Sequence, residues 1–184
     1  GQEPEASSIV NLKSDLVAVR GRNEESMLTT EAVLKGEPEN VEARFDKSYA
    51  LLKLGRPQEA LAVMKPILEG DGQTVDATTV ALAAALHYQL GQYEVAAQLA
   101  RKATTQMDRE YLRNPKYGAV SLTLIGAEAR LVHVAQAKTA MADFNAAVPN
   151  VQTISAIKKW MHPAAYLSGY GPCFEWLLLS VIGD

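Results

Sequence analysis

Apolar residues recur every three or four positions along most of the chain, which is the spacing of amphipathic helices. Ile9, Leu12 and Leu16 show this spacing near the start, and Phe45 and Tyr49 show it further along. Glycine, proline and asparagine interrupt the pattern at intervals and mark helix ends. The pattern predicts helices over residues 8–20, 24–36, 41–54, 57–68, 79–90, 93–107, 119–132, 135–147, 154–161 and 173–182.

A short turn sequence recurs between these predicted helices. Each copy has a glycine, then polar or aromatic residues, an acidic residue and a small residue, and the copies begin at Gly21, Gly55 and Gly91. A glycine can adopt the left-handed conformation that ends a helix, and the small residue lets the next helix pack closely. In a fourth copy, Val132 and His133 stand where the others have glycine and a polar residue. Two helices and a turn, repeated about every 35 residues, are typical of a helical solenoid.

Aligned on these turns, the chain resembles the tetratricopeptide repeat family, whose unit is about 34 residues long. The family places a small residue midway through the first helix of each unit, an alanine at the opening of the second helix, and a helix breaker at the end. The small places hold Ser14, Ser48, Ala84 and Ile125, the alanine places hold Ser26, Ala60, Ala96 and Ala137, and the closing places hold Pro38, Gly72, Asp108 and Pro149.

The chain departs from the family pattern in two ways. Ile125 is bulky where a small residue is expected. The large aromatic expected early in each first helix is absent at Val10, Arg44, Val80 and Ser121.

The resemblance implies an all-α fold, a right-handed α-solenoid of about four helical hairpins. The units are expected over residues 7–40, 41–74, 77–110 and 118–151. Residues 1–6 are expected to form a disordered leader, and residues 152–184 to form helices that cap the last apolar face, because the end of a solenoid needs covering. Residues 111–117 are predicted to be a loop, and Pro66 is predicted to kink or shorten its helix.

Composition and charge narrow the classes of function. The net charge of −3 argues against an electrostatic grip on nucleic acid. No apolar stretch approaches the roughly 20 residues that span a bilayer, so membrane insertion is not expected. Cys173 is the lone cysteine and lies in an apolar segment, which favours a buried, inert thiol over a nucleophile.

The sequence offers little for catalysis. His87, His133 and His162 are far apart and have no carboxylate or cysteine at metal-ligand spacing, so neither a metal nor a cofactor is expected. The glycines of residues 168–171 lack the strand and the lysine that a phosphate-binding loop needs. We therefore expect a protein that is not an enzyme.

The resemblance instead implies a concave groove lined by the first helix of each unit, which binds a protein or peptide segment. Aromatic anchors beside hydrogen-bonding groups suit such a groove, and Phe45, Tyr49 and Tyr88 are the main candidates. Packing between neighbouring helices explains Phe45 and Tyr49 equally well. The groove places hold Asn11, Asp15, Phe45, Tyr49, Lys53, Tyr88, Gln89, Leu122 and Arg130.

Other functions stay open. The segments 146–154, 165–167 and 174–177 resemble the ends of some bacterial regulatory proteins, in which a tetratricopeptide tail follows a cyclase or DNA-binding module. The chain would then be a regulatory tail that forms a homodimer through its apolar C-terminal helix. A third hypothesis is an envelope-assembly factor in the periplasm, whereas the main hypothesis places the chain in the cytoplasm.

Overall fold

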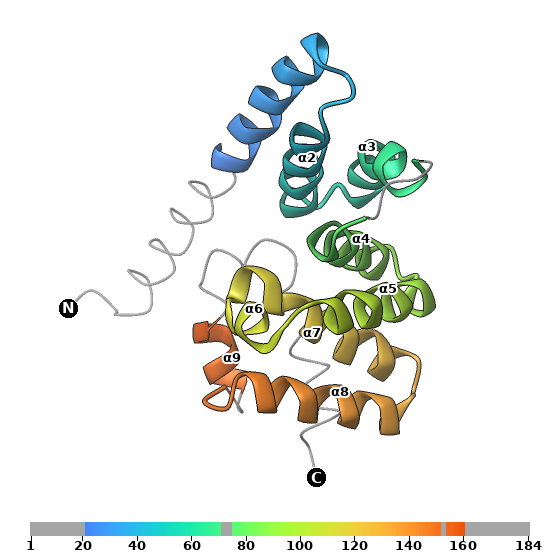
Figure 1. Ribbon diagram of the computed structural model, residues 1–184, viewed down its shortest axis with the longest axis vertical. Coiled ribbons are helices and arrows are strands. Elements are labelled where there is room, and N and C mark those ends of the chain that lie inside the picture. The colour runs from blue at the N-terminus through green and yellow to red at the C-terminus, as the bar shows by residue number, and fades with distance from the viewer. Residues whose placement is uncertain (1–20, 71–74, 152–153, 161–184) are drawn as a thin grey trace, which may run out of the picture.

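The computed structural model describes residues 21–70, 75–151 and 154–160, and within these ranges the chain is all-helical (Figure 1). An N-terminal helix is described over residues 21–36. The helices that follow are α2 (Val41–Lys53), α3 (Pro57–Leu68), α4 (Ala77–Gln89), α5 (Tyr93–Gln106), α6 (Arg109–Arg113), α7 (Pro115–Arg130), α8 (Val134–Ala147) and α9 (Ile154–Trp160).

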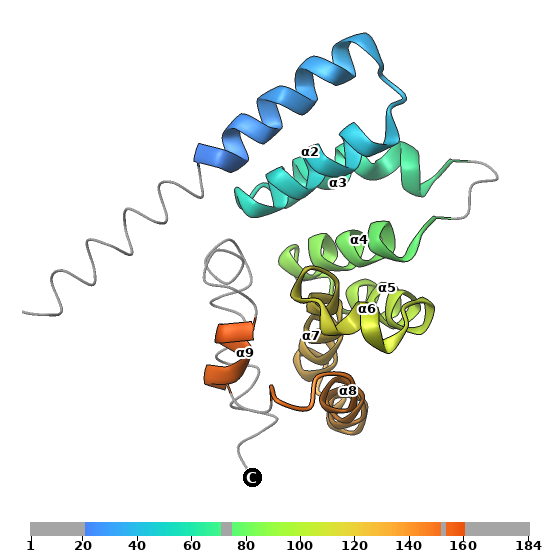
Figure 2. The same ribbon diagram turned by 60° about the vertical axis from the view of Figure 1, so that its left-hand side comes forward.

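Consecutive helices form three hairpins, α2–α3, α4–α5 and α7–α8. The second helix of one hairpin packs against the first helix of the next, as α3 does on α4 and α5 does on α7. The first helices also contact one another, α2 with α4 and α4 with α7. Figure 2 shows the hairpins following one another down the long axis, with α6 placed beside α7.

The close approach of the two helices in a hairpin explains the small residues that the sequence pattern singled out. Ser48 and Ala60 face each other fully buried, and the Ser48 hydroxyl donates to the Ala60 carbonyl oxygen at 3.1 Å. Ala84 and Ala96 are likewise fully buried in the second hairpin. A larger side chain at such a place would push the two backbones apart.

The packed interior consists of two apolar clusters that share α4. Leu82, Ala85 and Leu86 pack with α2 and α3, whereas Val80 and Ala84 pack with α5, α7 and α8. Because α4 is apolar on nearly every side, it can be buried on both faces. It is the central helix of the described fold.

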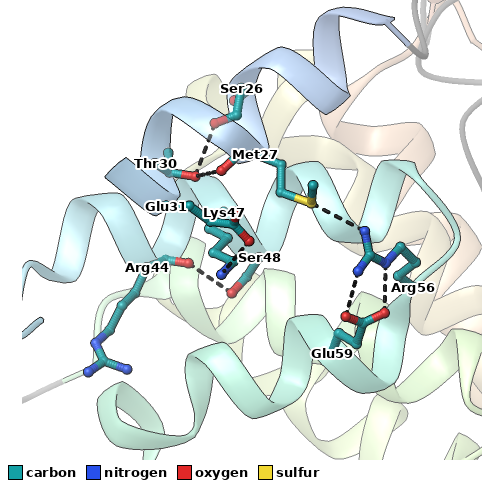
Figure 3. Close-up of polar contacts among 9 residues, drawn as sticks. All are labelled: Ser26, Met27, Thr30, Glu31, Arg44, Lys47, Ser48, Arg56 and Glu59. Atoms are coloured by element: carbon teal, nitrogen blue, oxygen red, sulfur yellow. Dashed lines mark hydrogen bonds and ion pairs between the residues drawn. The ribbon is translucent and has the colours of Figure 1, made fainter. Parts of the chain in front are cut away.

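The N-terminal helix is held on α2 and α3 by the contacts that Figure 3 draws. Lys47 Nζ on α2 lies 3.0 Å from Glu31 Oε1, and an Arg56 N–H donates to the Met27 sulfur at 3.3 Å. Thr30 is buried and satisfies its hydroxyl with the Met27 and Ser26 carbonyl oxygens of its own helix. The helix predicted over residues 24–36 is therefore present, over residues 21–36, and packs on α2 and α3.

Two sequence-based expectations about local structure are wrong. Gly21 was expected to end a helix, but it lies within the helical residues 21–36. Residues 111–117 were expected to form a loop, but they contain the end of α6 and the start of α7, where Asp108 caps α6 and Pro115 suits the first position of α7. Pro66 was predicted to kink or shorten its helix, and it does not shorten it, because α3 continues through it to Leu68, the last predicted residue.

The hairpin turns share one backbone geometry. Gly55 and Gly91 have φ values of +71° and +74°, as predicted for the left-handed end of a helix. At each turn the glycine N–H and the next N–H bond back to carbonyls of the last helical turn, as in Gly55 to Leu52 and Arg56 to Leu51. This paired bonding is the Schellman motif.

Val132 forms the same motif without a glycine. Its φ is +60°, its N–H bonds to the Ala129 carbonyl at 3.1 Å, and the His133 N–H bonds to the Glu128 carbonyl at 2.9 Å. The left-handed region is strained for an L-residue and most of all for a β-branched one. The third turn therefore carries strain that the other two avoid.

Replacing Val132 with glycine should relieve that strain. The side chain is 79% exposed, so little packing is lost, and we expect Val132→Gly to raise the free energy of unfolding by about 1 kcal/mol. Urea denaturation followed by circular dichroism measures the change. Val33→Gly is the matched control, because the same replacement at a partly exposed position inside the helical residues 21–36 should lower stability by about 0.5 kcal/mol. Equal effects at the two positions would contradict the strained turn.

Candidate functional site

A cleft of about 270 Å³ lies where the first helices of the three hairpins, α2, α4 and α7, meet. Aromatic side chains line it, together with small or branched apolar residues, a carboxylate and a hydroxyl. The lining residues are Phe45, Asp46, Tyr49, Thr78, Ala81, Leu82, Tyr117, Ala119 and Val120.

Helical spacing on each element places these residues on one face. Phe45 and Tyr49 are one turn apart on α2, and Tyr117 and Val120 are one turn apart on α7. On α4 the lining residues are Thr78, Ala81 and Leu82. The cleft is therefore a hollow with aromatic side chains from α2 and α7 and smaller side chains from α4.

Tyr117 is held in place by a second tyrosine from α6. The rings of Tyr111 and Tyr117 are stacked with their centroids 4.2 Å apart. A hydrogen bond with Tyr117, together with burial and the charges of Asp76 and Asp108, raises the pKa of Tyr111. Asp108 caps α6 by accepting from the Tyr111 N–H at 2.8 Å, which fixes the short helix beside the cleft.

Asp76 supports the cleft from the start of α4. Its carboxylate accepts from the backbone N–H groups of Thr78 and Thr79, at 2.9 and 3.1 Å, and from both threonine hydroxyls. Burial alone would raise the pKa of Asp76, but the four hydrogen bonds outweigh it and lower the pKa. Asp76 thus stays ionised and orients the Thr78 side chain that lines the cleft.

Lys53 lies one turn beyond Tyr49 on α2, and its ammonium nitrogen is 5.1 Å from the centroid of the Tyr49 ring. This is the distance of a cation–π contact. Burial lowers the pKa of Lys53 to about 8 from 10.5, and burial also raises the pKa of Tyr49.

The lowered pKa gives a testable pH dependence. The unfolded chain takes up the Lys53 proton as the pH falls through 10.5, whereas the folded chain does so only near 8. Burying Lys53 therefore costs no stability above about pH 10.5, and the full cost is present below about pH 8. We expect the Lys53 Cε chemical shift to titrate near pH 8, and Lys53→Met to stabilise the chain at neutral pH but not at pH 10.5. Titration at the ordinary lysine value would contradict the burial.

The structure brings together only part of the predicted groove. Phe45 and Tyr49 line the cleft, and Lys53 borders it through Tyr49. Asn11 and Asp15 lie outside the described residues.

The predicted groove residues of α4 and α7 lie elsewhere. Tyr88 is 7% exposed and packs edge-on against Tyr93 of α5, so it is a core residue. Gln89 is half-buried at the end of α4 and does not line the cleft. Arg130 lies over the Tyr93 ring at 5.8 Å.

Leu122 is also in the core rather than in a groove. Leu122 follows Val120 by two residues on α7, so its side chain is rotated by about 200° from the cleft face that Val120 occupies. It is 1% exposed. The family's groove places, transferred by spacing alone, therefore put Leu122 on the wrong face of α7. The sequence-based assignment of Leu122 to the groove is therefore corrected, because the residue is buried in the core.

Sequence reasoning missed most of the cleft's polar and small residues. Asp46 and Thr78 were not singled out, and Tyr117 was assigned to a loop. Pro115 could have predicted that Tyr117 lies on a helix, because proline suits the first position of a helix. Tyr111 and Tyr117 lie on either side of this proline.

Besides this cleft, the described residues line other hollows, among them one of about 660 Å³ between α3 and the end of α4. These residues contain no group of three or more His, Cys, Asp or Glu side chains that could hold a metal ion. None of their helices has the length and apolar character to cross a membrane. Cys173 and the predicted C-terminal dimer helix lie outside the described residues. The chain matches no protein-family model, no curated protein and no solved structure.

Proposed function

We propose that the chain is a non-catalytic interaction module of tetratricopeptide-like type, which binds a protein or peptide segment in the cleft between its first helices. The hairpin order supports a stacked array of hairpins, because each hairpin contacts the next through both of its helices. In such an array the first helices line one surface. The predicted groove and the observed cleft share Phe45 and Tyr49.

The size and lining of the cleft are the observations that carry this proposal. A cavity of about 150 Å³ holds a benzene ring, so 270 Å³ has room for one large side chain and part of its neighbour. Aromatic walls beside a few polar groups are what anchor a peptide side chain.

Blocking the cleft tests the proposal. Ala81→Phe places a ring in the hollow, whereas Ala142→Phe places the same ring on an exposed position of α8 outside the cleft. Peptides selected from a displayed random library against the wild-type chain should bind the Ala142→Phe variant normally. They should lose at least tenfold in affinity for Ala81→Phe, roughly the energy of one well-buried anchor.

Folding is the control for both variants. Helical circular dichroism and the urea midpoint should match the wild-type chain before binding is compared. If selected peptides bind Ala81→Phe as tightly as the wild-type chain, the cleft is not the binding surface and the proposal is wrong.

A further inference from the structure

We propose that the segment bound in the cleft presents an arginine side chain, which lies against the Tyr117 ring with its guanidinium group directed to Asp46. This inference rests on the proposed function and specifies the chemistry of its partner. It follows from the charges around the cleft, from the aromatic walls and from the apolar stretch between them.

The only charged side chain among the described residues lining the cleft is a carboxylate, that of Asp46. Asp46 is exposed and has no ion-pair partner among the described residues. The neighbouring cations of α2 are engaged elsewhere, because Lys47 pairs with Glu31 and Arg44 donates to the Pro38 carbonyl oxygen at 2.9 Å. The Asp46 carboxylate is therefore available to a cation from a partner.

A second negative region lies at the α6 end of the cleft. Asp76 and Asp108 are close enough to the Tyr111–Tyr117 pair for their charges to act on Tyr111. The basic side chains of α6 do not offset them at the cleft. Arg113 donates to the Ala147 carbonyl oxygen at 3.0 Å, and Arg109 lines a separate hollow beside α8. A carboxylate ligand would meet like charge here, whereas a cation would not.

The tyrosine walls favour a cation as well. Lys53 already rests over one face of Tyr49, so a partner's cation would stack on Tyr117, on the side of the cleft away from Lys53. Tyr117 offers a second tyrosine across the cleft, and Ala81 and Val120 provide an apolar stretch for an alkyl stem.

Arginine fits this arrangement better than lysine does. Its planar guanidinium stacks on aromatic faces and pairs with a carboxylate through two parallel hydrogen bonds. It is also less strongly hydrated than an ammonium group, so it enters a partly dry cleft at lower cost.

Matched peptides test the inference on the full chain. The probes are capped peptides in which leucines flank arginine, citrulline or glutamate, and binding is followed by NMR through the amide signals of Asp46, Tyr49 and Tyr117. Citrulline keeps the shape of arginine and removes its charge. We expect the arginine peptide to shift these signals with about tenfold higher affinity than the citrulline peptide, and the glutamate peptide to bind most weakly.

The variant Asp46→Asn should reduce the affinity of the arginine peptide to that of the citrulline peptide, with no change in folding. Equal binding of arginine and citrulline peptides at the cleft, tighter binding of the glutamate peptide, or no shift with any of the three would overturn the arginine assignment. The proposed function fails separately, when library-selected peptides of any sequence bind the Ala81→Phe variant as well as the wild-type chain.

Discussion

Gly118→Ala should lower the free energy of unfolding by at least about 3 kcal/mol. A Cβ atom at Gly118 would overlap the Leu112 carbonyl oxygen of α6 and lie 2.8 Å from Cη2 of Trp160 on α9. A backbone oxygen cannot rotate away as a side chain can, so α6 would have to move off α7. Urea denaturation followed by circular dichroism measures the loss.

Gly21→Ala is the control for this prediction. Gly21 is also helical, but a Cβ atom there would have no neighbour within 4 Å. Replacing an open helical glycine with alanine should raise stability by about 0.5–1 kcal/mol. If Gly118→Ala were as stable as the wild-type chain, α6 could not lie against α7 as described.

The same substitution bears on the cleft. α6 carries Tyr111, which stacks on the cleft residue Tyr117. A displaced α6 would therefore leave Tyr117 without its stacking partner. We attribute the glycine at this position to the close approach of α6, which places the aromatic pair at the edge of the cleft.

Arg101→Met should lower the free energy of unfolding by about 2 kcal/mol, because it leaves a buried carboxylate with one partner fewer, although the Arg101 side chain is itself half-exposed. Glu128 on α7 is 2% exposed, and its two oxygens contact Arg101 of α5 and His133 of the third turn, the latter at 3.0 Å. The ion pair of Arg101 with Glu128 joins adjacent hairpins. The contact of Glu128 with His133 supports the strained turn at Val132. Without Arg101 the carboxylate keeps only the histidine.

A double-mutant cycle isolates this interaction. Glu128→Gln removes the charge while keeping the side chain's shape, so Arg101→Met on that background should cost less than about 1 kcal/mol. Urea titrations of all four chains provide the comparison. A cost for Arg101→Met that is the same on both backgrounds would show that Arg101 contributes by packing, not by pairing with Glu128.

The sequence predicted most of the helices because apolar periodicity and turn glycines are local signals. Apart from α6 and the start of α7, the helices between Val41 and Ala147 lie within two residues of the predicted boundaries, and Gly55 and Gly91 have the expected backbone. The Val132 turn could be predicted only from the spacing of the hairpins, since nothing in its residue type favours a positive φ. Gly21 shows the converse, because a glycine in the recurring turn sequence is here part of a helix.

The cleft was less predictable because three helices far apart in sequence build it. Phe45 and Tyr49 could be chosen from one helix, but Tyr117 and Ala81 join them only through packing. The burial of Tyr88 depends on Tyr93 of a neighbouring helix. The local sequence pattern identifies which residues share a helix face, whereas the tertiary contacts decide which of those residues remain exposed.

The most direct test of the binding cleft is the structure of the chain with its tightest library-selected peptide. We predict that a peptide side chain occupies the hollow between Phe45, Tyr49 and Tyr117, with its backbone crossing α4 near Ala81. A peptide bound instead on the outer helices α3, α5 or α8, with that hollow empty, would contradict the account.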